Sequence, residues 1–77
     1  MRIYNVMLEG REGGLGFLKT FEVSADTGEE AINLALADAK RLELDIVGVE
    51  EITLKSTKHI GTAARVLKTY GTGYFEL

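Results

Sequence analysis

Residues 26–42, DTGEEAINLALADAKRL, constrain the fold of this chain more than any other segment. Their apolar side chains recur at intervals of three and four residues, the spacing that places them along one side of an α-helix. We therefore predict a main helix over about residues 27–42, with an apolar stripe formed by Ile32, Ala35, Leu36, Ala39 and Leu42. Because this stripe should face the core, Leu36→Asp is expected to unfold the domain by burying an unpaired charge.

Both ends of this segment carry the signals of a helix end. At the start, the side chain of Asp26 or Thr27 can accept a hydrogen bond from an unpaired N–H group of the first turn. An acidic residue follows three positions later, as in a capping box. At the other end, Lys40 and Arg41 place positive charge where the helix dipole is negative.

Strand-forming residues dominate the chain on both sides of the helix. Residues 2–9 and 15–23 are rich in β-branched and aromatic side chains, and the glycine-rich GREGG between them predicts a β-hairpin. Residues 46–55, IVGVEEITLK, predict a third strand, in which the apolar alternation changes phase. A β-bulge near Glu50 and Glu51 would return both halves of that strand to one buried face.

Residues 62–70, TAARVLKTY, fit two kinds of element. Their composition suits a strand, whereas their apolar positions have helical spacing, so we favour a short second helix and leave a strand as the alternative. Residues 74–77 predict a terminal strand. The chain is thus expected to be one α+β domain of residues 1–77 with the order ββαβ(α)β, in which the main helix packs on one face of an antiparallel or mostly antiparallel sheet of three or four strands.

The composition suits a compact fold and excludes several kinds of functional site. Hydrophobic residues make up 45% and charged residues 27% of the 77 positions, as in ordinary globular domains. The absence of cysteine excludes disulfides, thiolate zinc sites and cysteine nucleophiles, and His59 is the one histidine. We therefore expect no catalytic, metal or cofactor site. No segment is apolar for the length of a membrane span, so a cytoplasmic, non-enzymatic protein without a membrane partner is expected.

Charge is distributed unevenly along the chain, although the net charge is only −3. Residues 1–51 contain eleven acidic and five basic side chains, whereas residues 52–75 contain four basic and no acidic ones. Basic side chains beside aromatic ones can follow a phosphate backbone while a base stacks on a ring. Phosphate or nucleic-acid binding is therefore one hypothesis, with a candidate face formed by Lys55, Lys58, Arg65 and Lys68.

A protein partner is the other hypothesis and the one we favour. Leu34 lies off the apolar stripe of the main helix, and the terminal segment YFEL can provide an exposed sheet edge. The outward side of the helix supplies a candidate partner face formed by Glu30, Asn33, Leu34, Ala37 and Arg41. The sequence thus predicts a small non-enzymatic protein-interaction or regulatory module that binds a protein partner or forms a homo-oligomer.

Overall fold

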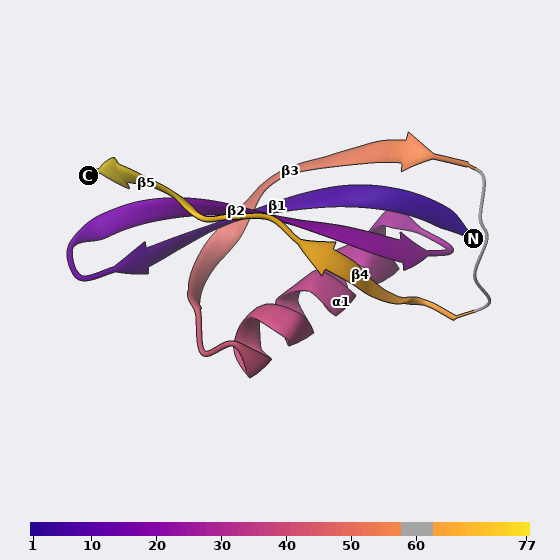
Figure 1. Cartoon of the computed structure of the whole chain (residues 1–77), viewed down its shortest axis with the longest axis horizontal. Helices are drawn as coiled ribbons and strands as arrows, with labels where there is room; N and C mark the ends of the chain where they lie inside the picture. The colour runs from indigo at the N-terminus through magenta and orange to yellow at the C-terminus, as the bar shows by residue number, and fades with distance from the viewer. Residues whose placement is uncertain (58–62) are drawn as a thin grey trace.

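An antiparallel sheet with a helix against one face makes up the part of the chain described by the computed structural model, residues 1–57 and 63–77 (Figure 1). In chain order, the elements are β1 Arg2–Glu12, β2 Leu15–Ala25, α1 Gly28–Arg41, β3 Asp45–Ser56, β4 Arg65–Thr69 and β5 Gly73–Glu76. The strand order is β3-β1-β2-β4, and β5 pairs with β2 on the same side as β4. The predicted α+β fold is confirmed, with five strands rather than three or four.

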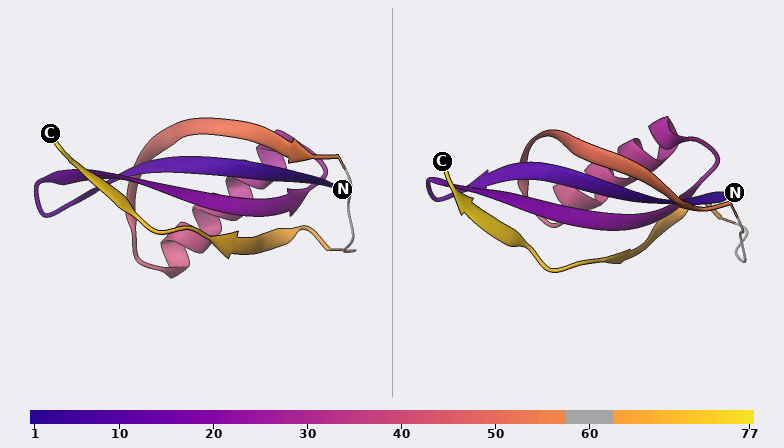
Figure 2. Two further views of the ribbon diagram at one scale, coloured as in Figure 1. Left: turned by 45° about the horizontal axis from the view of Figure 1, so that its top comes forward. Right: turned by 90° about the horizontal axis from the view of Figure 1, so that it is seen from above.

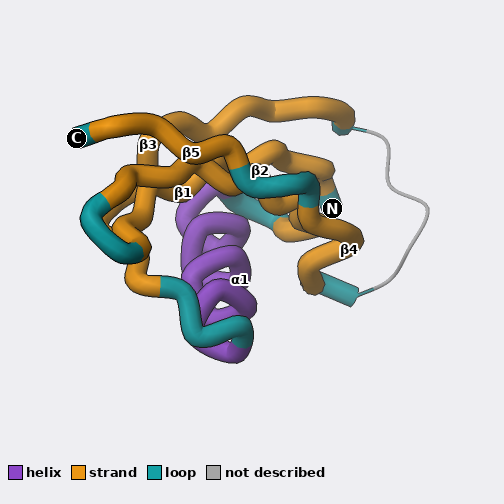
Figure 3. The backbone as a smooth tube through the Cα atoms, turned by 60° about the vertical axis from the view of Figure 1, so that its left-hand side comes forward, coloured by secondary structure: helices purple, strands orange, loops and turns teal. Residues whose placement is uncertain are grey.

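The helix lies under the middle of the sheet, and β3 and β4 form opposite edges (Figure 2). α1 contacts β1, β2, β3 and β4 from one side only, as the tube view also shows (Figure 3). No described helix covers the other side, which we call the open face. The sheet therefore has one face that forms the core with α1 and one face on which polar side chains can gather.

The first two strands form the predicted hairpin. They pair along their full length without a register shift, so both are longer than the sequence suggested. Gly13 and Gly14 make the turn with φ angles of 55° and 86°. Residues other than glycine rarely adopt this region, which is why the GREGG stretch marks the turn correctly.

The third strand carries the predicted bulge. Met7 and Leu8 are neighbours in β1, but they pair with Glu51 and Val49, so Glu50 has no partner in β1. This register shift returns the apolar side chains of both halves of β3 to the face that meets α1. Two further shifts interrupt the pairing of β3 with β1, and residues 51–54 form its longest regular run.

Residues 65–69 form the strand β4, so the prediction of a second helix over residues 62–70 is wrong. Val66 lies opposite Val23 of β2, and Lys68 lies opposite Glu22. Residue 62, the first of the predicted helix, falls outside the described residues. The pairing satisfies backbone groups of β2 that a helix at this place would leave without strand partners. The terminal strand is confirmed as β5, which pairs with the first part of β2.

The helix begins and ends within one residue of its predicted bounds. Thr27 is the N-cap, and its hydroxyl accepts a hydrogen bond of 3.1 Å from the Glu30 N–H. The Glu30 carboxylate accepts one of 2.8 Å from the N–H of Asp26, the residue before the N-cap, an arrangement close to a capping box. Of the two candidate caps, the structure therefore uses Thr27.

The buried side of α1 matches the predicted stripe at Ala35 and Ala39 but not at Leu36 or Leu42. Ala31, Ala35 and Ala39 are fully buried, whereas Leu36 is 36% exposed. The predicted place of Leu36 in the core is therefore wrong. Small side chains are needed where the helix comes closest to the sheet, because the sheet fills the core with large side chains. The large side chains of the sheet are Tyr4, Val6, Leu8, Phe21 and Val23.

Candidate functional site

The members of the predicted partner face on α1 differ in exposure. Asn33, Ala37 and Arg41 are exposed, but Leu34 is half-buried and packs against the core. Glu30 is half-buried and serves the helix cap. Leu34 therefore projects away from the protein less than expected, and it lines two shallow hollows that also take in the other four residues of the face.

A shallow groove separates this side of α1 from β4. It brings part of the candidate partner face next to one residue of the candidate phosphate-binding face, Arg65. An ion pair of 3.0 Å between the Arg41 and Asp38 side chains lies along it. Its lining residues are Leu34, Ala37, Asp38, Arg41, Ala64, Arg65 and Val66.

Three of the predicted phosphate-binding side chains come together on the open face. β4 places Arg65 opposite Ser24 and Lys68 opposite Glu22, two residues of β2 on the same face of the sheet. Lys55 reaches the same carboxylate from β3, across β1, and forms an ion pair with it. Lys58 falls outside the described residues.

Glu22 is the member of this group that sequence reasoning missed. Its hydrogen bond with Lys55 lowers the pKa of Glu22 and raises the pKa of Lys55. The Tyr70 hydroxyl donates to Glu22 at 3.4 Å, and the Lys68 ammonium lies 4.8 Å from the centre of the Tyr70 ring. Glu22 thus neutralises Lys55 and leaves Lys68 and Arg65 as net positive charge. No local signal predicts this, since Glu22 and Lys55 are 33 positions apart on non-adjacent strands.

Large apolar side chains remain exposed along β3, at the edge of the sheet. Among the described strands, β3 pairs only with β1, so one side of its twelve residues is free of strand pairing. Val47 is 53% exposed and Leu54 is 49% exposed. We call this surface the β3 edge and define it by the apolar side chains of β3 and the adjoining helix, Leu36, Val47, Val49, Ile52 and Leu54.

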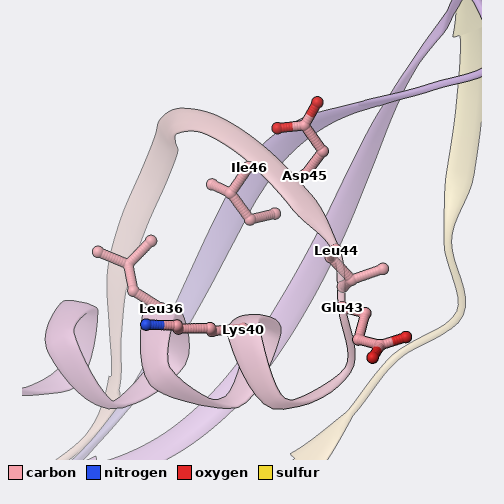
Figure 4. A pocket seen from close by; sticks show the side chains of 6 residues that line it. All are labelled: Leu36, Lys40, Glu43, Leu44, Asp45 and Ile46. Carbon is pink, nitrogen blue, oxygen red and sulfur yellow. The ribbon is translucent and has the colours of Figure 1, made fainter.

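A hollow at the beginning of β3 extends this surface onto the helix (Figure 4). Leu36 and Lys40 project from α1, and Ile46 lies on the arch of β3 above them. Leu36 belongs to both the hollow and the β3 edge. A partner that lies along β3 can therefore also contact the helix.

The two edges of the sheet carry opposite charge. β3 has the exposed side chains of Asp45, Glu50 and Glu51, and none of them forms an ion pair with any described residue. β4, RVLKT, has Arg65 and Lys68 and no acidic residue. Acidic residues of the first half and the basic Arg65 and Lys68 of the second half thus lie on opposite edges of one sheet, although Lys55 lies on β3, paired with Glu22.

Within residues 1–57 and 63–77, no group of three or more His, Asp or Glu side chains is arranged to hold a metal ion. Nor does any helix in this part of the chain have the length and apolar character needed to cross a membrane. Comparison of the chain with protein-family models, with curated proteins and with solved structures gave no match.

Proposed function

We propose that this chain is a non-enzymatic interaction module that binds an extended segment of a protein along the β3 edge. The observation that carries the proposal is the combination of a long edge strand with exposed apolar side chains on the strand and the adjoining helix. Small folded domains bury most of their large apolar residues, and a contiguous exposed group is typical of an interaction surface. An unpaired strand edge also offers backbone N–H and C=O groups to a partner strand.

The chemistry of the β3 edge defines the kind of segment it would accept. Apolar side chains of the segment would pack on Val49, Ile52 and Leu54, and basic ones would approach the carboxylates of Glu50 and Glu51. Register shifts leave only residues 51–54 as a regular run, so backbone pairing is short. Side-chain contacts must therefore supply much of the affinity, which favours selective over general strand capture.

Selection of short random peptides against the folded protein tests this proposal. Bound peptides should be enriched in apolar residues alternating with lysine or arginine. Leu54→Lys should weaken the binding of a selected peptide at least tenfold. Burying a leucine side chain contributes about 1.5–3 kcal/mol, and each 1.4 kcal/mol changes the dissociation constant by a factor of ten. Fluorescence polarisation measures the affinities.

Leu77→Lys is the matched control, because Leu77 is an exposed leucine at the far end of β5. It should leave peptide affinity unchanged. Enrichment of acidic peptides, or an equal loss of peptide affinity in Leu54→Lys and Leu77→Lys, would contradict binding at the β3 edge.

Phosphate or nucleic-acid binding is the second candidate function, favoured by the gathering of Lys55, Arg65 and Lys68 on the open face with Tyr70 beside Lys68. Glu22 cancels one of these charges, which makes this the weaker proposal. A labelled single-stranded oligonucleotide should bind weakly, with an affinity that falls as salt rises, and Arg65→Glu with Lys68→Glu should abolish the binding. An oligonucleotide that stays free at low salt would contradict this candidate.

A further inference from the structure

The chain itself contains a strand of the kind that the β3 edge would accept. β4 has the sequence RVLKT, in which the apolar residues lie between Arg65 and Lys68. Its outer side pairs with no described strand, and Leu67 is more than one-third exposed. β4 is therefore an apolar strand with basic side chains, and it lies at the edge of the sheet opposite β3.

We propose that the segment bound along the β3 edge is β4 of a second copy of this chain, so that the sheet continues from one molecule into the next. The inference rests on the proposed function, because it uses the same edge. It adds the identity of the partner and the way in which the two molecules meet.

The strand directions suit this contact. β3 is antiparallel to β1, β1 to β2 and β2 to β4, so β3 and β4 run in opposite directions (Figure 1). A second molecule placed beside the first in the same orientation therefore pairs its β4 antiparallel to β3. Both helices then lie on the same side of the continuous sheet. β4 has five residues, enough to cover the regular run at residues 51–54 of β3.

The charges favour this head-to-tail contact over a symmetric one. Glu51 lies opposite Met7 on the open face, the face that carries Arg65 and Lys68. Pairing β3 with β4 of the next copy brings these opposite charges together on one face. Pairing β3 with β3 would instead bring Glu50 and Glu51 near their own copies, and pairing β4 with β4 would do the same to the cations. Like charges on directly opposed strands destabilise a sheet.

A head-to-tail contact leaves one β3 edge and one β4 edge free after each addition. Assembly therefore continues beyond a dimer, into a ring if the rotation between copies closes and otherwise into an open chain. Sedimentation velocity at low salt should show a mass that rises with protein concentration from the 8.4 kDa monomer through dimer to larger species. Added salt should lower that mass, because exposed charge pairs are screened.

Charge reversal on one edge at a time tests the identity of the contact. Glu50→Lys with Glu51→Lys makes both edges basic, and Arg65→Glu with Lys68→Glu makes both edges acidic. Each double variant alone should associate at least tenfold more weakly than the natural chain. An equal mixture of the two variants should recover assembly, since each β3 edge then meets a β4 edge of opposite charge. The chain with all four substitutions should also assemble.

Arg2→Glu with Lys19→Glu is the control, because it changes the net charge as much as the β4 variant does but alters neither edge strand nor the hollow beside β3. It should keep the assembly of the natural chain. If the β3 variant lost association and the β4 variant kept it, the head-to-tail contact would be contradicted. The contact would then be a symmetric dimer formed through β3. A natural chain that stays monomeric at all concentrations but still binds basic peptides at the β3 edge would overturn this inference and leave the proposed function intact. A chain that neither self-associates nor binds peptides at the β3 edge would overturn both this inference and the proposed function.

Discussion

Ala35→Asp is expected to unfold the domain. The Ala35 side chain is fully buried between α1 and the sheet, where a carboxylate would find no charged partner among the described core residues. An uncompensated buried charge costs several kcal/mol. A chain of 77 residues has a free energy of unfolding of about 4–12 kcal/mol, at roughly 0.05–0.15 kcal/mol per residue. Circular dichroism should therefore show loss of most native structure at 25 °C.

Leu36→Asp is the matched control, with the same new residue at the next position. Because Leu36 is partly exposed, an aspartate there can keep its carboxylate in water. The free energy of unfolding should fall by only about 1–2 kcal/mol, the part of a leucine side chain's burial that is lost. A folded Ala35→Asp variant beside an unfolded Leu36→Asp variant would show that the side of the helix centred on Leu36, rather than the alanine side, faces the core.

Phe21→Ala should lower the free energy of unfolding by about 3–5 kcal/mol, the usual cost of replacing a buried phenylalanine by alanine. Phe21 is among the largest fully buried side chains, on the β2 face that meets α1, and β4 pairs beside it through Thr69. The cavity would lie at the centre of the core, where the backbone of β2 is held by strands on both sides. Urea titration followed by circular dichroism measures the change.

Phe75→Ala makes the same chemical change on β5, where the ring is 37% exposed over Gly16. Its cost should be less than half that of Phe21→Ala, because water already reaches much of the ring. Equal losses would mean that β5 contributes to the core as much as the centre of β2 does, contrary to the burial of these two side chains.

Two glycines of the GREGG stretch show how far a local pattern can be interpreted. Gly13 adopts a positive φ and belongs to the turn, as its sequence context indicates. Gly10 lies within β1, where a Cβ atom would be only 2.1 Å from the ring of Phe17 on the neighbouring strand. It is needed for a contact with another strand, and nothing next to it in the sequence distinguishes that role from a turn.

The candidate site was likewise predicted only in part from the sequence. A protein-binding edge was expected from the terminal segment, and the side chains of α1 were expected to form the contact face. The exposed apolar group instead lies along β3 and includes Leu36, which the sequence pattern assigned to the core. The sequence predicts β3 as a strand but not its neighbours in the sheet. Only the strand order places it at an edge.

The sequence by itself determined the features that depend on neighbours in the chain. These are the helix with a cap at Asp26 or Thr27, the hairpin with its glycine turn and the phase change that puts a bulge at Glu50. Only the tertiary structure decided which side of α1 is buried, that residues 65–69 form a strand, and that acidic and basic residues line opposite edges of one sheet. The physical reason is that caps, turns and alternation are satisfied within a few residues, whereas burial and strand pairing depend on partners far along the chain.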